Sequence, residues 1–391
     1  MPLRNLSILL ICQLISATGA IVLVTLGGII GSSLTQNQAL ATLPVSIMVI
    51  SIAATTVPAT LLMRSIGRKH GSTLASLSAA VAALLAAYAV SISSFPFFIF
   101  AAAVFGINMA FTQQYRYAAV ESVDQKYASR AISIVLIGAI GGAFVGSELV
   151  KHGHSWISDV PYGGTLTGVS ILYVIQALLF QTLGPLRGDE HGTTTLTHRT
   201  LGQIVTQPVY IVAVLGGTVA YGVMTLIMTA TPLSMHIHDG YTLEATANVI
   251  RGHVLGMYVP SLVSGILIER LGTIKMMTVG AFALLASAVI GLQGQTISHY
   301  WFALVLLGVG WNFLYVGGTT MLTLTYSMAE RFKAQAVNEF CVFGTSATAS
   351  LLAGTVIYVY GWYTLVLIPL PLLVSMVVGL YLVRRDPLVR L

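Results

Sequence analysis

Charged residues are scarce in this chain. Only 8% of its 391 residues are Asp, Glu, Lys or Arg, and 56% are hydrophobic. An ordinary soluble domain has about 25% charged residues. A chain so poor in charge cannot cover a water-facing surface, so a soluble globular domain is excluded. The mean hydropathy of +0.88 instead predicts a polytopic membrane protein, in which lipid surrounds the apolar side chains.

Three further absences narrow the function. The only cysteines, Cys12 and Cys341, lie in separate apolar segments, so neither a disulfide framework nor a cysteine metal site is expected. No glycine-rich loop ends in Lys-Ser or Lys-Thr, so we expect no nucleotide-driven mechanism and no cofactor. The net charge of +6 comes from basic residues scattered singly at segment ends, so no nucleic-acid partner is expected.

Long apolar runs make up most of the chain. A membrane helix needs roughly 20 apolar residues, and cutting the chain at its polar breaks gives twelve candidate spans. The candidate spans are residues 7–30, 40–63, 72–92, 95–117, 130–150, 165–184, 207–231, 246–268, 275–294, 298–324, 335–358 and 361–384.

The longest polar stretch, Gly184 to Thr206, lies between the sixth and seventh candidate spans. We therefore predict an N-terminal six-helix bundle over residues 1–184, a cytoplasmic linker over 185–206 and a C-terminal six-helix bundle over 207–391. The predicted fold class is an all-α membrane protein with twelve transmembrane helices in two pseudo-symmetric bundles.

The positions of the cations predict the orientation. An even number of spans leaves both termini on one side of the membrane. Fifteen Lys and Arg residues fall on that side, Lys151 falls on the other, and Arg116 and Arg251 lie inside or near spans. Because Lys and Arg near span ends favour the cytoplasm, we expect both termini to be cytoplasmic and the protein to lie in the cytoplasmic (inner) membrane.

Two landmarks recur at the same offset. Gly67 and Gly272 are 205 residues apart, and the loop Ser122–Tyr127 aligns with Ser327–Phe332 at the same offset. Two landmarks at one offset predict duplicated six-helix units. Parallel repeats about an axis along the membrane normal are one recognised transporter design.

The loops around these glycines carry a family signature. Thr60–Lys69 keeps the last Gly and the basic pair of the pattern Gly-x-x-x-Asp-Arg-x-Gly-Arg-Lys, but it has Thr60 for the first Gly and Arg64 for the acid. The copy at 265–272 keeps both glycines, the acid and the Arg. With the twelve spans and the central loop, this chain resembles the major facilitator superfamily over its whole length. The resemblance implies two helical bundles that rock around a central site.

The signature residues predict a cytoplasmic gate. Glycine at a helix end allows a positive φ and a close approach of backbones, and the cations can pair with acids of a neighbouring loop. The alternative is that these cations only follow the topology rule, since exposed ion pairs are weak, about 0–1 kcal/mol. The predicted gate residues are Arg64, Gly67, Arg68, Lys69, Gly265, Glu269, Arg270 and Gly272.

Two other patterns of the family are broken. Ala102 stands where the fourth span often carries an Arg, and Ala143 stands where drug–proton antiporters carry Pro on the fifth span. Both departures lower the expectation of drug efflux. The stretches His253–Pro260 and Gly310–Thr320 are similar to a bacterial subgroup that includes riboflavin uptake proteins.

Polar side chains inside apolar spans are costly and usually functional. Span ten carries an aromatic stripe beside an amide, which suits a flat substrate with polar edges such as a flavin. Helix packing is the alternative, and the family resemblance, which implies that span ten lines the central cavity, favours substrate contact. The predicted substrate-binding residues are Asn108, Gln113, Tyr221, Trp311, Asn312 and Tyr315.

Four ionisable residues are candidates for proton coupling. Glu339 lies inside an apolar run, where burial favours the protonated acid, and His253 titrates near neutral pH. Arg251, near the outer end of its span, can bind an anionic substrate group, and Arg116 lies near the cytoplasmic end of the fourth span. The alternatives are a structural ion pair for Glu339, helix packing for His253 and contact with the outer interface for Arg251. For Arg116 the alternative is contact with the inner headgroups or a pair with Glu121 or Asp124.

These features together predict a secondary transporter of a small organic solute that works by alternating access as a monomer. We expect proton symport for uptake, with a vitamin-like, flavin-like or siderophore-like substrate. Proton-driven efflux of drugs or metabolites is the alternative within this class. A polytopic membrane enzyme is the alternative from another class, and its nearest cluster of candidate ligands is His236, His238 and Asp239. We expect no resident metal ion.

Overall fold

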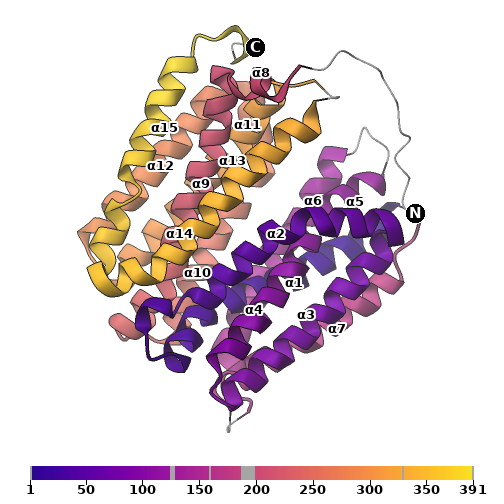
Figure 1. Ribbon diagram of the computed structural model, residues 1–391, viewed down its shortest axis with the longest axis vertical. Coiled ribbons are helices and arrows are strands. Elements are labelled where there is room, and N and C mark those ends of the chain that lie inside the picture. Colours follow the sequence, from indigo (N-terminus) through magenta and orange to yellow (C-terminus); the bar gives the residue numbers. More distant parts are fainter. Residues whose placement is uncertain (1, 124–127, 158–159, 186–198, 328–329, 390–391) are drawn as a thin grey trace. The chain divides into compact units, whose positions relative to one another are not determined.

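The computed structural model describes residues 2–123, 128–157, 160–185, 199–327 and 330–389. In these ranges the chain forms helices joined by turns and contains no β-strand (Figure 1). The contacts divide the chain into two compact units. Unit 1 comprises residues 1–188, 228–251 and 353–359, and unit 2 comprises residues 189–227, 252–352 and 360–391.

Unit 1 is built mainly from the first seven α-helices. They are α1 (Pro2–Leu34), α2 (Leu43–Ile66), α3 (Arg68–Ser91), α4 (Phe95–Thr112), α5 (Tyr115–Glu121), α6 (Ala128–Gly153) and α7 (Gly163–Gln181), with the short η1 (Gln38–Leu40) between α1 and α2. The π-helix η3 (Leu233–His238) also belongs to unit 1 and packs against α1.

Unit 2 holds most of the remaining helices. These are α8 (Leu201–Val205), α9 (Pro208–Pro232), α10 (Leu243–Tyr258), α11 (Ser261–Leu271), α12 (Thr273–Gln293), α13 (Ile297–Thr323), α14 (Arg331–Leu367), α15 (Leu370–Val383) and η4 (Pro387–Val389). Parts of α9, α10 and α14 fall in unit 1. The predicted bundle boundaries at residues 184 and 207 stay a prediction.

The predicted twelve-helix membrane fold is confirmed. Eleven helical segments of the described chain are long and apolar enough to cross a membrane. The last segment, 336–383, has 48 residues and contains Gly361, whose φ of 77° and ψ of 179° interrupt the helix. Since one crossing needs roughly 20 residues, this segment supplies two crossings, and the total is twelve.

Two predicted spans are interrupted. The span predicted over 246–268 is split into α10 and α11 because Pro260 has no N–H to continue the helix. The span predicted over 95–117 is split into α4 and α5 at Gln113 and Gln114, where no proline explains the break. Gln114 is bound there by Arg68, whose Nη1 donates to Oε1 of Gln114 at 3.5 Å.

Small residues let the helices of unit 1 approach closely. A Cβ at Gly138 or Gly142 of α6 would collide with the main chain of α1, and α3 buries a series of alanines between its neighbours. Helices α1 and α6 are therefore in close contact at these glycines. In membranes such contacts supply the packing that apolar attraction between helices cannot supply.

The two signature turns have the same backbone conformation. Gly67 joins α2 to α3 with φ 83° and ψ 154°, and Gly272 joins α11 to α12 with φ 86° and ψ 151°. Only glycine adopts this conformation without strain. The agreement supports the duplication predicted from the offset of 205 residues. The second landmark lies partly outside the described residues, which omit 124–127 and 328–329.

Candidate functional site

Three of the six predicted substrate residues meet in one cluster of aromatic rings in unit 2. The ring of Tyr221 on α9 lies 5.3 Å from Trp311 and 5.1 Å from Tyr315, both on α13, measured between centroids. It lies 5.6 Å from Phe343 on α14, and Tyr258 on α10 lies 6.3 Å from Trp311. We call these five residues the aromatic cluster. Four helices contribute to it.

The geometry of the aromatic cluster suits a flat ligand. Trp311 and Tyr315 are one helical turn apart and stack with an interplanar angle of 20°, while Tyr221 meets both edge-on. Tyr221 and Tyr315 are half-buried, whereas Trp311 is only 5% exposed. The indole Nε1 of Trp311 is buried and has no acceptor in the described part of the chain, which leaves one donor for a polar edge.

The two predicted asparagines lie in helix–helix contacts. Nδ2 of Asn108 donates to the carbonyl of Ala75 on α3 at 3.0 Å, and Nδ2 of Asn312 donates to the carbonyl of Met257 on α10 at 2.8 Å. Neither side chain is more than 1% exposed. Each Oδ1 lacks a donor within the described residues. Gln113, also predicted to bind substrate, caps α4 and is half-buried.

The ionisable residues predicted to couple protons lie in different surroundings. Glu339 on α14 is half-buried and accepts a bond from Nδ2 of Asn338 at 3.4 Å. His253 on α10 is fully buried, with Nδ1 at 2.8 Å from the Leu304 carbonyl and Nε2 without a partner in the described chain. Arg251 lies 3.2 Å from Glu148 on α6. The side chain of Arg116 lies outside the described residues.

One predicted gate residue has an acidic partner. Arg68, at the start of α3, donates from Nε and Nη2 to the two carboxylate oxygens of Glu121, at 2.7 Å and 2.5 Å. Two parallel bonds of this kind are stronger than a single-point contact. The equivalent positions at the offset of 205 residues are Thr273 and Tyr326, so the second repeat cannot form this pair.

The other predicted gate residues make fewer contacts. Lys69 is half-buried, and Arg270 is exposed. A Cβ at Gly67, Gly265 or Gly272 would meet open space. The side chains of Arg64 and Glu269 lie outside the described residues.

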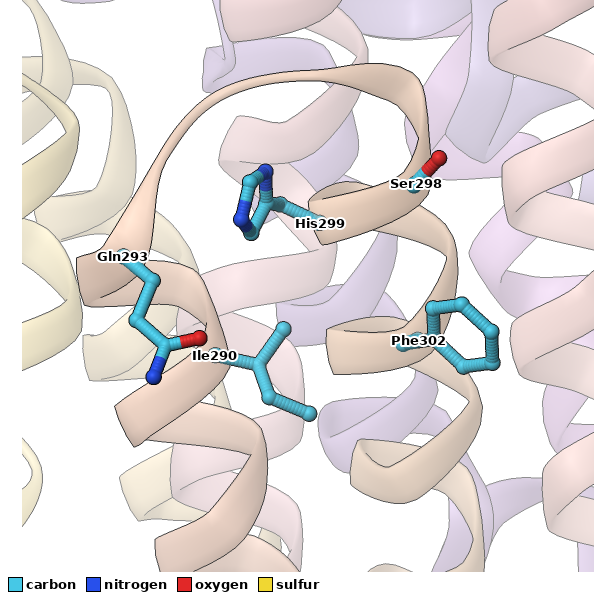
Figure 2. A pocket seen from close by; sticks show the side chains of 5 residues that line it. All are labelled: Ile290, Gln293, Ser298, His299 and Phe302. Carbon is cyan, nitrogen blue, oxygen red and sulfur yellow. The ribbon is translucent and has the colours of Figure 1, made fainter.

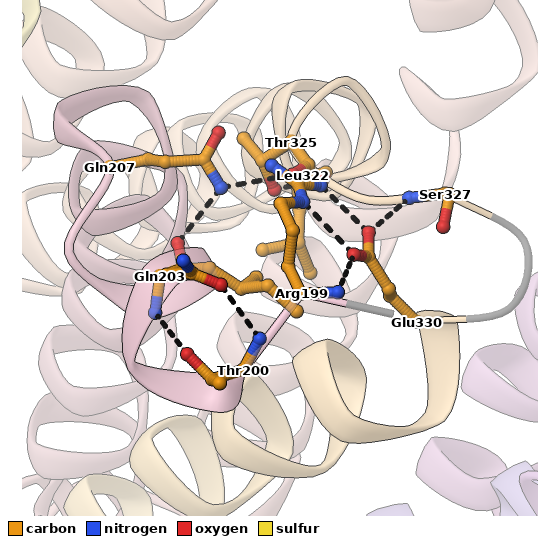
Figure 3. Close-up of polar contacts among 9 residues, drawn as sticks. Arg199, Thr200, Gln203, Gln207, Leu322, Thr325, Ser327 and Glu330 are labelled. Atoms are coloured by element: carbon orange, nitrogen blue, oxygen red, sulfur yellow. Dashed lines mark hydrogen bonds and ion pairs between the residues drawn. The ribbon is translucent and has the colours of Figure 1, made fainter. Parts of the chain in front are cut away.

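A second bidentate ion pair ties the residues before α8 to the loop before α14 (Figure 3). Nε and Nη2 of Arg199 donate to Glu330 at 2.9 Å and 2.7 Å, and the main-chain N–H groups of Arg199 and Ser327 donate to the same carboxylate at 3.0 Å and 2.9 Å. Nη2 of Arg199 also donates to the Thr325 carbonyl at 2.9 Å. The Glu330 side chain is only 3% exposed.

The same bonds set the charge of both partners. The Arg199 side chain, together with the Ser327 N–H, lowers the pKa of the Glu330 carboxyl well below its usual range. The bond to Glu330 in turn raises the pKa of the Arg199 guanidinium. Both groups are therefore charged at every physiological pH.

Sequence reasoning missed this pair, and it also missed Gln176. Fully buried on α7, Gln176 accepts from Ser16 at 3.2 Å and donates to Ser76 at 2.9 Å and to the Tyr115 hydroxyl at 3.0 Å. A lone glutamine within an apolar run was the only signal available. The bonds link α7 to α1, α3 and the start of α5.

A shallow pocket of about 250 Å³ lies at the turn between α12 and α13 (Figure 2). The His299 ring stands between the two helix ends, and its Nδ1 lies 2.7 Å from the Thr296 hydroxyl. Because one helical hairpin forms the whole pocket, it is separate from the aromatic cluster.

In the described structure, His236, His238 and Asp239, the cluster considered for an enzyme, do not form a group of metal ligands. Nδ1 of His236 lies 2.7 Å from the Tyr241 carbonyl. Across the described ranges, no three His, Cys, Asp or Glu side chains lie close enough together to hold a metal ion.

Comparisons with known proteins agree with this architecture. The family model for the major facilitator superfamily matches residues 239–390. The riboflavin transporter RfnT of Brucella anthropi is 36% identical over 380 residues, which cover 97% of this chain and 95% of that protein. An uncharacterised transporter of the same superfamily type, YdeG of Bacillus subtilis, is 28% identical over 376 residues, covering 90% of this chain and 86% of its own.

Solved structures show the same fold at low sequence identity. An inward-facing, unoccupied bacterial homologue of the human lysosomal transporter Spinster superposes with a TM-score of 0.75 at 13% identity, covering 98% of this chain and 97% of its own. The nucleoside transporter NupG superposes with a TM-score of 0.73 at 13% identity, covering 98% of this chain and 99% of its own.

Proposed function

This chain belongs to the major facilitator superfamily, and from that membership we propose that it imports a flavin by alternating access, in symport with protons. The fold and the relatives are those of transporters, not of enzymes, so the protein is a multi-pass membrane transporter. The predicted family is thereby confirmed. The flavin, the direction and the proton are the proposal.

The aromatic cluster carries this proposal. A flavin presents a flat three-ring system with polar groups along one edge, and an aromatic face stabilises such a ring by stacking. Trp311 and Tyr315 stack on each other, so a flat ring can extend this stack from the half-buried Tyr315, and the Trp311 Nε1 is a donor without a partner in the described chain. The relative RfnT is named as a riboflavin transporter, which supports the same substrate class.

The orientation follows from charge. Twelve crossings leave both termini on one side, and the excess of Lys and Arg there favours the cytoplasm. We therefore propose the cytoplasmic membrane as the location, with both termini inside. The Gly153 end of α6 then faces outward, and the Arg68 end of α3 faces the cytoplasm.

A proton gradient is the proposed energy source. Glu339 is half-buried within the membrane-spanning part of α14, where a carboxyl group can exchange a proton during the transport cycle. Nδ2 of Asn338 bonds this carboxyl at 3.4 Å and can hold it in either protonation state. His253 remains the second candidate on the same reasoning.

The function is tested by uptake of radiolabelled riboflavin into cells that can neither make nor import it. Expression of the protein is expected to restore uptake and growth at low riboflavin concentration. Trp311→Ala should raise the KM by about tenfold, since stacking on one aromatic ring is worth about 0.5–1.5 kcal/mol beyond area burial. Trp301→Ala is the matched control, because Trp301 is 40% exposed and outside the aromatic cluster.

Three outcomes contradict the proposal. No uptake by a correctly inserted protein excludes a flavin importer. Faster loss of preloaded riboflavin, without uptake, indicates the efflux alternative. If Trp311→Ala and Trp301→Ala raise the KM for riboflavin equally, the aromatic cluster is not the binding site.

A further inference from the structure

The last two carbonyl groups of α10 are bound by side chains. Nδ2 of Asn312 on α13 donates to the Met257 carbonyl oxygen at 2.8 Å. The Oγ of Ser261 donates to the carbonyl oxygen of the next residue, Tyr258, at 2.5 Å. Both acceptors stand just before Pro260, which separates α10 from α11. The two side-chain bonds therefore lie at the break in this span.

Pro260 explains why these carbonyl groups need other donors. Proline has no N–H for the carbonyl of Gly256, and its ring collides with that carbonyl and disturbs the helix. The pattern of bonds is displaced here, since the N–H of Leu262 donates to Val259, three residues back, at 3.3 Å. Within a membrane, side chains and neighbouring helices bind the main-chain groups that a proline frees. Asn312 is such a donor.

The bond from Asn312 extends a close contact between α10 and α13. One turn before Met257, Nδ1 of His253 lies 2.8 Å from the Leu304 carbonyl oxygen of α13. Between these two bonds the main chains touch, because a Cβ at Gly308 would lie 2.4 Å from the carbonyl oxygen of His253. The last turn of α10 is therefore positioned by α13.

Helix α11, beyond the break, offers this turn little support. Of the side chains described on α11, only Ser264 and Ile268 are buried. A Cβ at Gly265 would meet open space. The end of α10 thus depends on its contact with α13.

The same bond lies beside two members of the aromatic cluster. Asn312 follows Trp311 on α13, and Met257 precedes Tyr258 on α10. The ring centroids of Tyr258 and Trp311 lie 6.3 Å apart. Because the residues next to these two rings form the bond, the bond limits how far the rings can separate.

We propose that Asn312 is a positioning residue of the flavin site, which compensates for Pro260 and so holds Tyr258 against Trp311. The inference rests on the proposed flavin transport. Asn312 is 1% exposed, so it acts through the two rings and not by contact with the flavin. Without its amide, the last turn of α10 loses its donor from α13, and the Tyr258 ring moves away from Trp311.

The test combines Asn312→Ala with Pro260→Ala, each alone and both together. Pro260→Ala restores an N–H group at the break, so the helix can bind its own carbonyl groups again. Two quantities are measured for each variant. One is the melting temperature of the purified protein in detergent, without substrate. The other is the pair of KM and Vmax for radiolabelled riboflavin uptake, with Vmax divided by the amount of inserted protein.

Ser287→Ala is the matched control. The Oγ of Ser287 on α12 donates to the Ala303 carbonyl of α13 at 2.7 Å, and Ser287 is 2% exposed. This substitution therefore also removes a buried bond between a side chain and a main-chain carbonyl at α13. Neither α12 nor α13 contains a proline, so no broken helix depends on the bond.

Asn312→Ala is expected to lower the melting temperature by several degrees and to raise the KM for riboflavin by about fivefold, the size expected when one ring contact is lost, with Vmax almost unchanged. In the Pro260→Ala background the same substitution should change both quantities much less, because Met257 then has a helical donor. Ser287→Ala should lower the melting temperature equally in both backgrounds and keep the KM of the parent.

The proposal is overturned if Asn312→Ala lowers the melting temperature equally with and without Pro260, since the bond is then ordinary helix packing. It is also overturned if Asn312→Ala keeps the KM of the parent, or if Ser287→Ala raises the KM as much. An Asn312→Ala variant that inserts only in the Pro260→Ala background is the expected result in its extreme form, and one that inserts in neither background contradicts it. The melting temperatures need no flavin. A parent that imports no riboflavin therefore rejects the substrate, while the melting temperatures still test the dependence of Asn312 on Pro260.

Discussion

At the scale of single residues, Glu339 separates accumulation from exchange. Glu339→Gln keeps an oxygen that can accept from Asn338 but removes the ability to bind and release a proton. We expect uphill accumulation of riboflavin to be lost while counterflow between equal pools continues, because exchange needs no net proton movement. Both rates are measured in proteoliposomes with an imposed pH gradient.

The control for this prediction is Glu244→Gln, which removes an exposed acid at the other end of the membrane. It should keep both activities. Accumulation that survives intact in Glu339→Gln rejects Glu339 as the coupling acid and leaves His253 as the second candidate.

Residue chemistry alone indicated which polar side chains have a role but not which role. Trp311, Tyr315 and Tyr221 were predicted as one site from the stripe on one helix and from family resemblance, and they do lie together. Asn108 and Asn312 were predicted as substrate ligands because polar side chains are rare inside apolar spans. Each instead donates an amide hydrogen bond to a carbonyl of a neighbouring helix. A sequence cannot distinguish these situations, because both satisfy the rule against unpaired polar groups in lipid.

At the scale of elements, the signature glycines are expected to be needed for their conformation. Gly67→Ala and Gly272→Ala meet open space, so the only cost is a positive φ near 85°, about 1–3 kcal/mol each. Gly265→Ala also meets open space but lies within α11, where alanine gains up to about 1 kcal/mol. Melting temperatures in detergent should therefore fall for the first two and hold or rise for the third.

The opposite order of melting temperatures would contradict the role assigned to the two glycine turns. A Gly265→Ala variant less stable than Gly272→Ala would mean that close approach to an unseen neighbour, rather than backbone conformation, explains the signature glycines.

The ion pair between Arg199 and Glu330 is expected to stabilise unit 2 independently of pH over the physiological range. The folded pKa of Glu330 lies below its unfolded value of about 4.3, so its contribution is fully present above that value and is lost only as pH falls through the folded pKa. Glu330→Gln and Arg199→Ala should lower the melting temperature by the same few degrees at pH 8 and at pH 5.

Below about pH 4 the difference in melting temperature between Glu330→Gln and the parent should shrink, since Glu330 of the unfolded parent then binds a proton while the folded carboxylate stays ionised. Arg385→Ala, which removes an exposed cation near the C-terminus, is the control and should change little. If the difference in melting temperature between Glu330→Gln and the parent already changes between pH 8 and pH 5, another titrating group acts through this ion pair.

A helix boundary could be predicted from the sequence where a single residue determines it. The break at Pro260 could have been read from the sequence, since proline cannot continue a helix. The break at Gln113 and Gln114 and the partner of Glu330 could not, because they depend on contacts with residues distant along the chain. Arg199 is 131 residues away from Glu330.

At the scale of the whole molecule, the offset of 205 residues predicted a duplicated architecture, and the matching turns at Gly67 and Gly272 agree with it. The duplication does not extend to every contact. The first repeat pairs Arg68 with Glu121, whereas the second repeat has Thr273 and Tyr326 there. The acid of its loop, Glu330, instead binds Arg199 from the segment before α8. Sequence periodicity thus predicted the backbone better than it predicted the polar contacts.

The orientation of both halves is tested with one exposed cysteine at each end of each half, in the Cys12→Ser, Cys341→Ser background. Ser155→Cys and Ser298→Cys should react in intact cells with a membrane-impermeant maleimide, and His70→Cys and Arg385→Cys should react only after permeabilisation. All four residues are exposed or lie in exposed turns. Parallel repeats require the two halves to give the same pattern. If Ser298 and Arg385 exchange their behaviour while Ser155 and His70 do not, the number of crossings between the halves is odd. The two termini would then lie on opposite sides, and the two halves would not be parallel repeats.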